Sequence, residues 1–176
     1  MDENRQAIEA SIEGRQRDAP ETTGEDEQVQ LVIVTLAGRL YAFYGTAVIA
    51  IAKVRDIVPI PGTPDYIPGV MYHQGRVESV IDIGRIMGLA EATRALDRKS
   101  RVVIAVSGEV YSGVLVDAVE DVVDLPRSGI YAPLETIAPE IREFVAGETQ
   151  YQERSTVVLD LAKVFDRVLE RGDGAA

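Results

Sequence analysis

The apolar residues of this chain fall into short runs that recur in the same order in its two halves. Residues 31–36 and 101–106 are rich in Val, Ile and Leu, and each run is followed by a glycine-containing turn. A second apolar run comes after each turn, at 40–43 and at 110–116. Two runs of strand length around such a turn are typical of a β-hairpin. We therefore expect one hairpin at the start of each half.

Further elements repeat after each hairpin. A third strand that ends in proline is predicted over 54–59 in the first half and over 119–126 in the second. Each half then ends an apolar strand with an aspartate, Asp82 or Asp160, which is followed by apolar residues at helical spacing. An aspartate there can cap a helix by accepting hydrogen bonds from free backbone N–H groups. We expect a short helix after Asp82 and a C-terminal helix that ends near Arg171.

These patterns define two pseudo-repeats, at about 31–88 and 101–171, each with about five short strands and a helical turn. Five short strands with Gly and Pro at the corners favour closure into a small barrel over an open sheet with two free edges. A repeat of this size buries little surface alone, so we expect the two repeats to pack together and leave a groove between them. The predicted fold is mainly β, with two small barrels.

Charge sets the N-terminus apart from the rest of the 176 residues. The chain carries 29 acidic and 18 basic residues, a net charge of −11, and residues 1–28 contain nine of the acidic and three of the basic ones. Ile8 and Ile12 are the main apolar residues of this segment, which predicts a disordered or marginally helical tail; a specific docking element is the alternative. We also expect residues 172–176 to be disordered. An acidic chain without basic clusters is a poor partner for nucleic acid or anionic membranes.

The chain offers little material for catalysis. It has no cysteine and a single histidine, His73, and it lacks phosphate-binding glycine loops and nucleophile elbows. We therefore expect no enzymatic activity, no cofactor and no metal site, and interpret the chain as a binding module. Two alternatives remain: a small enzyme, which would need His73 beside a carboxylate, and a module that sequesters its partners. The acidic start and the short apolar runs predict a cytoplasmic protein without a signal peptide or membrane insertion.

Several motifs, in order, resemble those of the CheW-like domain family, adaptors of bacterial chemosensory arrays. They are Thr35-Leu36 with Tyr41, the segment at Val48, the run 66–70, the run 75–83 and the run 113–119. The resemblance covers about residues 29–170. It implies two intertwined five-stranded SH3-like barrels with no catalytic activity. It further implies that the domain bridges the signalling tip of chemoreceptors and the regulatory domain of a CheA-type histidine kinase, and joins other CheW-like domains.

The resemblance also implies a receptor-binding groove. The residues that it assigns to this contact are Val48, Ile51, Gly69, Val103 and the hairpin tip Tyr72, His73 and Gln74. The valines and Ile51 are equally natural core residues, and Gly69 equally suits an unusual backbone angle.

Three polar positions depart from the family pattern. The usual Asn-Leu-Arg-Gly hairpin reads Tyr72-His73-Gln74-Gly75 here, Gly84 replaces a second arginine, and Ala50 replaces an acidic residue. Glutamine cannot form the charged fork with which arginine holds a carboxylate. One interpretation is a divergent, auxiliary adaptor that does not join the kinase; the other is ordinary drift, with apolar contacts carrying the binding.

Overall fold

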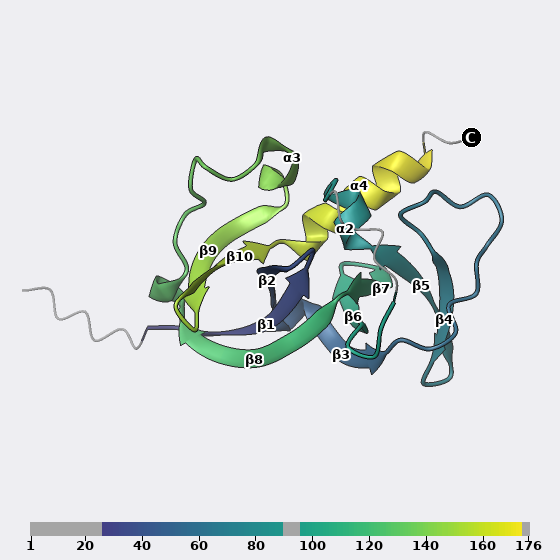
Figure 1. Ribbon diagram of the computed structural model, residues 1–176, viewed down its shortest axis with the longest axis horizontal. Helices are drawn as coiled ribbons and strands as arrows, with labels where there is room; N and C mark the ends of the chain where they lie inside the picture. The colour runs from purple at the N-terminus through teal and green to yellow at the C-terminus, as the bar shows by residue number, and fades with distance from the viewer. Residues whose placement is uncertain (1–25, 90–95, 174–176) are drawn as a thin grey trace, which may run out of the picture.

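The computed structural model describes residues 26–89 and 96–173 (Figure 1). Its elements in chain order are β1 (Gln28–Leu36), β2 (Arg39–Tyr44), η1 (Gly45–Ala47), β3 (Val48–Lys53), β4 (Gly69–His73), β5 (Arg76–Asp82), α2 (Ile83–Ile86), β6 (Arg101–Ser107), β7 (Val110–Val116), β8 (Ala118–Pro126), η2 (Arg127–Gly129), α3 (Pro139–Arg142), β9 (Val145–Tyr151), β10 (Arg154–Leu159) and α4 (Leu161–Asp173). Most of the predicted tail, residues 1–25, lies outside the described residues.

The strands form two five-stranded sheets, in the orders β8-β1-β2-β10-β9 and β3-β6-β7-β5-β4. In each sheet, one isolated antiparallel bridge joins the two end strands. Tyr131, which follows β8, pairs with Glu148 of β9, and Val58, which follows β3, pairs with Val70 of β4. Both sheets are thereby closed into small barrels, called barrel 1 (β1, β2, β8, β9, β10) and barrel 2 (β3 to β7). The prediction of a mainly β fold with two barrels is confirmed.

The barrels do not coincide with the sequence repeats. Barrel 1 combines β1 and β2 from the first repeat with β8, β9 and β10 from the second, and barrel 2 combines the remaining strands. Parallel pairing joins the exchanged parts, with Tyr41 of β2 opposite Val157 of β10 and Val80 of β5 opposite Gly113 of β7. Neither repeat can complete a barrel alone, so the two halves form one folding unit. The resemblance implied this intertwining, and the residue pattern alone did not.

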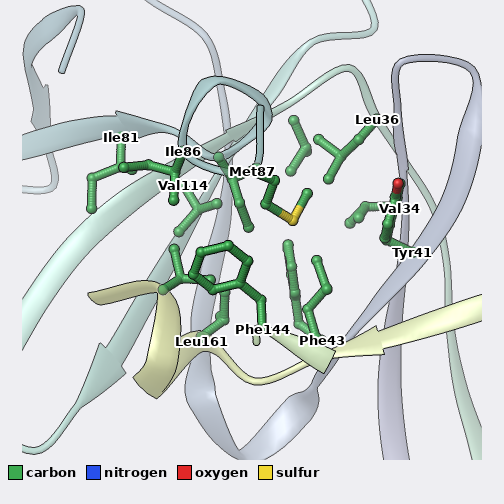
Figure 2. Close-up of a cluster of buried hydrophobic side chains, with 14 of the residues drawn as sticks. Val34, Leu36, Tyr41, Phe43, Ile81, Ile86, Met87, Val114, Phe144 and Leu161 are labelled. Atoms are coloured by element: carbon green, nitrogen blue, oxygen red, sulfur yellow. The ribbon is translucent and has the colours of Figure 1, made fainter. Parts of the chain in front are cut away.

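The largest core lies between the barrels rather than inside either of them (Figure 2). Barrel 1 has a small interior cluster that includes Leu31 and Ile33, and barrel 2 has another that includes Val102 and Ile104. The alternate residues of the same strands face the junction between the barrels. There they pack with α2, α4 and Phe144 in a cluster called the junction core. The continuous apolar runs of β1 and β6 therefore belong to strands that are buried on both faces.

One predicted strand is misplaced. The third strand of the first half is β3 at Val48–Lys53 instead of 54–59, because residues 48–53 form the ladder with β6. The residues after β3 lead to the bridge at Val58 that closes barrel 2. The corresponding strand of the second half is confirmed as β8.

The ends of the domain also differ from expectation. Of the predicted tail, Gln28 opens β1, while Asp26 accepts a hydrogen bond from Ser128 and Glu27 pairs with Arg127. At the C-terminus α4 continues through Gly172 to Asp173, beyond the expected end.

Both predicted caps are present. Asp82 accepts a hydrogen bond from the Arg85 backbone N–H at 3.1 Å at the start of α2. Asp160 accepts one from the Ala162 N–H at 3.0 Å at the start of α4. Burial raises the pKa of the Asp82 carboxyl above its usual value, while the Arg85 N–H and the Arg85 charge act in the opposite direction.

We predict that Asp82 makes folding stability depend on pH. Its raised pKa means that the folded state binds the proton more tightly than the unfolded state does. Protonation of Asp82 therefore stabilises the fold below the ordinary pKa of 3.8, and this stabilisation is lost as the pH rises through the pKa of the folded state. In Asp82→Asn this loss is absent, and a capping oxygen remains. The stability of Asp82→Asn relative to the unaltered chain should therefore increase between about pH 3 and about pH 7 in urea unfolding.

A companion variant separates the cap from the charge. Asp82→Ala removes the capping oxygen as well as the titrating group, so it should be about 1 kcal/mol less stable than Asp82→Asn across this range. A stability difference between Asp82→Asn and the unaltered chain that stays constant with pH would contradict the prediction.

Candidate protein-interaction site

One face of the barrel 2 sheet connects the junction core with the solvent. Residues that pair directly across neighbouring strands point to the same face of a sheet. A cross-strand row therefore links Ile51 of β3, Val103 of β6, Val114 of β7 and Ile81 of β5. The last three are buried in the junction core, whereas Ile51 at the end of the row is 40% exposed. Ile51 thus marks the edge of the junction core on this sheet.

The same face continues to the β4–β5 hairpin. Val77, Ser79 and Ile81 alternate along β5 and share this face, and the register places Tyr72 opposite Val77 and Val70 opposite Ser79. The bridge partner of Val70, Val58, is on this face as well.

Toward the hairpin turn this face is open to solvent, with Tyr72 and Val77 each 66% exposed. The hairpin patch, defined as Val58, Val70, Tyr72 and Val77, is therefore an apolar surface continuous with the buried junction. Adjacent exposed apolar side chains of this kind mark protein-binding surfaces.

The predicted tip residues divide between the two faces of the hairpin. Gln74 and Gly75 form its two-residue turn, both with positive φ, at 46° and 87°. His73 is on the face opposite to Tyr72. Its Nε2 atom is buried and has no hydrogen-bond partner among the described residues, so no carboxylate orients this ring as a general base.

The charged neighbours of His73 in the hairpin have partners of their own. Glu78 is buried and pairs with Arg76, whose Nε lies 3.5 Å from the carboxylate, and the Arg76 guanidinium stacks 4.8 Å from the centre of the Tyr111 ring. The enzyme alternative therefore finds no support in this cluster.

Gly69 has a structural reason to be glycine. It is buried with φ +149°, and a Cβ atom there would lie 2.1 Å from the Val58 carbonyl oxygen. This close approach allows the Val58–Val70 bridge that closes barrel 2. Gly69 thus supports the hairpin patch from behind and presents no side chain to a partner.

The remaining predicted site residues lie mostly below the surface. Val103 is fully buried, so its side chain cannot contact a partner. Val48 is half-buried, lies opposite Ala105 and packs against the junction core. Three of the predicted contact residues are exposed to solvent in the structure: Ile51, Tyr72 and the turn residue Gln74.

Sequence reasoning missed Val58, Val70 and Val77 of the hairpin patch. The signal that could have identified Val77 is the two-residue turn, because it fixes Val77 opposite Tyr72. No local signal pairs Val58 with Val70, since the bridge forms only when the barrel closes.

Within residues 26–89 and 96–173, no group of three or more His, Cys, Asp and Glu side chains could hold a metal ion. No helix in the same part of the chain is long and apolar enough to cross a membrane.

Comparison with known proteins agrees with this geometry. The family model for the CheW-like domain matches residues 30–169. The Chemotaxis protein CheW of Treponema pallidum is 28% identical over 142 residues, which cover 80% of this chain and 84% of that protein. The Bacillus subtilis Chemotaxis protein CheW is 26% identical over 145 residues, with coverages of 82% and 89%.

Two other similarities extend the comparison. The Protein FrzA of Myxococcus xanthus is 30% identical over 86 residues, 49% of this chain and 52% of that protein. The crystal structure of the scaffolding protein TtCheW from Thermoanaerobacter tengcongensis superposes with a TM-score of 0.68 at 26% identity and covers 79% of this chain and 88% of that one.

We predict that Gly69→Ala destabilises the fold by more than about 1 kcal/mol, because the added Cβ would overlap the Val58 carbonyl and force the closing bridge apart. Urea unfolding measures this loss. Gly172→Ala is the matched control, since a Cβ at Gly172 meets nothing within 4 Å. Equal stability of the two variants would show that the bridge does not constrain Gly69.

Proposed function

Because the chain belongs to the CheW-like domain family, a family of scaffolds and adaptors, we propose that it couples methyl-accepting chemoreceptors to a CheA-type histidine kinase without catalysing a reaction. It would act in the cytoplasm, at receptor arrays. The observation that carries this proposal is the exposed apolar hairpin patch, on the sheet face that also builds the junction core.

This face suits the helical tip of a receptor. An amphipathic helix docks through apolar side chains spaced along one side, and it needs an apolar strip of matching length with few charges. Tyr72 and Val77, which pair across the hairpin, offer such a strip. Binding energy at interfaces concentrates in a few buried aromatic and apolar contacts, so the missing family charges need not abolish association.

The predicted receptor residues take different roles in this proposal. Ile51 and Tyr72 would contact the receptor directly, with Gln74 at the margin of the contact. Val48, Gly69 and Val103 would shape the surface through packing. His73, on the other face of the hairpin, would hold the tip in position rather than touch the receptor.

The hairpin tip bears on whether the chain also binds the kinase. The position of the family arginine holds Gln74, which is exposed at the turn and carries no charge. An uncharged tip favours a second candidate function, an auxiliary adaptor that binds receptors or other CheW-like domains without joining the kinase.

The deciding experiment is calorimetric titration of the full chain against a receptor signalling-tip fragment and, separately, against the regulatory domain of the CheA-type kinase. Binding to both supports the bridging adaptor. Binding to the receptor alone supports the auxiliary adaptor, and binding to neither overturns the proposed partners.

We predict that Val77→Asp weakens binding of the receptor fragment by at least about tenfold, because it places a charge in the centre of the apolar contact. The melting temperature should stay close to that of the unaltered chain, since Val77 is mostly exposed. Val122→Asp, at an exposed valine of β8 in barrel 1, is the matched control and should bind the receptor fragment normally. Equal weakening by both substitutions would argue against the hairpin patch.

A further inference from the structure

An apolar groove lies in barrel 1, away from the hairpin patch of barrel 2. The parallel pairing of β2 with β10 covers only Tyr41 to Phe43 and Val157 to Leu159. Toward Arg39 and Arg154 the two strands have no ladder between them, and the space beside them is a groove of about 530 Å³. The segment 134–138, which precedes α3, forms its other wall.

The groove has a fixed shape. Its wall segment is held by Arg142, which donates a hydrogen bond to the Ile137 carbonyl at 3.1 Å, and by the Leu134 N–H, which donates to the Glu148 carboxylate at 2.9 Å. Glu148, the acidic residue of the groove lining, is therefore engaged within the protein. The lining is largely apolar, and Leu134 is 58% exposed.

Two cations border this apolar lining. Arg39 and Arg154 are both exposed, and neither forms an ion pair within residues 26–89 and 96–173. Arg39 lies close enough to Tyr41 for its charge to oppose the burial that raises the pKa of the Tyr41 hydroxyl. An apolar groove with two unpaired arginines fits a segment that combines apolar and acidic side chains.

The N-terminal segment of this chain has that chemistry. Residues 1–25 contain seven acidic and three basic side chains, and their Ile8 and Ile12 are each followed by a glutamate, Glu9 and Glu13. The spacing of four residues would place both isoleucines on one side of a helix, with the two glutamates beside them.

The tether allows this segment to reach the groove. Glu27 is anchored by Arg127 at η2, directly before the stretch that leads to the groove wall. An extended chain from Ile12 to this anchor spans up to about 50 Å at about 3.3 Å per residue. The nine residues of β1, whose far end lies near Arg39, cover only about 30 Å. A short tether also gives an effective concentration in the millimolar range, so weak contacts suffice.

We infer that the acidic N-terminal segment docks in the barrel 1 groove of its own chain, with Ile8 and Ile12 against the Leu134 wall and Glu9 and Glu13 beside Arg39 and Arg154. The docked segment would occupy this groove reversibly and exclude other acidic, amphipathic segments from it. The hairpin patch on barrel 2 stays open in this arrangement, so the inference does not depend on the proposed adaptor function.

The absence of cysteine makes a direct test possible. A nitroxide spin label on Ser11→Cys, between the two isoleucines, should broaden the amide NMR signals of Gly38 and Ala138 in the full chain. Leu134→Glu should reduce this broadening by about tenfold, whereas Leu169→Glu, at a similarly exposed leucine of α4, should leave it unchanged. Higher salt should also weaken it, because the arginines are exposed.

Three controls make the outcome decisive. Arg39→Glu should reduce the broadening, and Glu9→Arg in the same chain should restore part of it. Ile8→Asp with Ile12→Asp should abolish docking as judged by the amide shifts of Gly38 and Ala138, whereas Thr22→Asp with Thr23→Asp, which adds equal charge, should not. In a further sample, one chain carries the spin label without isotope, and a second chain carries the isotope without the spin label. The amide signals of the second chain should not broaden, because docking is within one molecule.

The inference is overturned if the spin label leaves the amide signals of Gly38 and Ala138 sharp or broadens only the amide signals of the hairpin patch. It is equally overturned if the broadening occurs between molecules, or if it is as strong in Leu134→Glu as in the chain with Leu134.

Discussion

Burial of β1 and β6 on both faces is the constraint from which the architecture follows. One side of each strand fills the interior of its own barrel, and the other side packs into the junction core. Such a strand needs covering elements above and below, and neither sequence repeat supplies enough of them. The exchange of hairpins between the repeats meets this need, because each barrel is completed by strands from both halves. The parallel pairs β2–β10 and β5–β7 join the strands of one repeat to those of the other.

The junction also organises the helices. α4 places Leu161, Val164 and Phe165 in the junction core, where they pack near Phe144 and the side chains of α2. Burial of a large aromatic side chain such as Phe165 contributes a few kcal/mol, more than the local preference of a short helix can supply. The aspartate caps set where α2 and α4 begin, and the core determines that they persist.

The proposed function uses the same sheet face that builds the junction. Along that face the side chains pass from complete burial at Val103 and Val114 to exposure at Tyr72 and Val77. A partner that covers the exposed part would extend a face that is already buried where the barrels meet, and it would need little reorganisation of the scaffold. Specificity would then reside in a few residues at the hairpin, which is where the chain departs from the pattern of its family. The groove of barrel 1 is a separate surface with a different chemistry, an apolar lining bordered by two exposed arginines.

The sequence by itself determined the β class, the hairpins, the two aspartate caps and the double repeat, because turn glycines, alternation and capping are local chemistry. The assignment of a contact to Tyr72 in the hairpin came from the family resemblance. Tertiary structure decided which strands share a barrel, where β3 begins, and that Val103 is buried while Val77 is exposed. These outcomes depend on hydrogen bonds between segments far apart in the chain and on which face of a strand another sheet covers. A valine has the same local preferences in both settings, so only closure of the barrels and formation of the junction could distinguish a core residue from a contact residue.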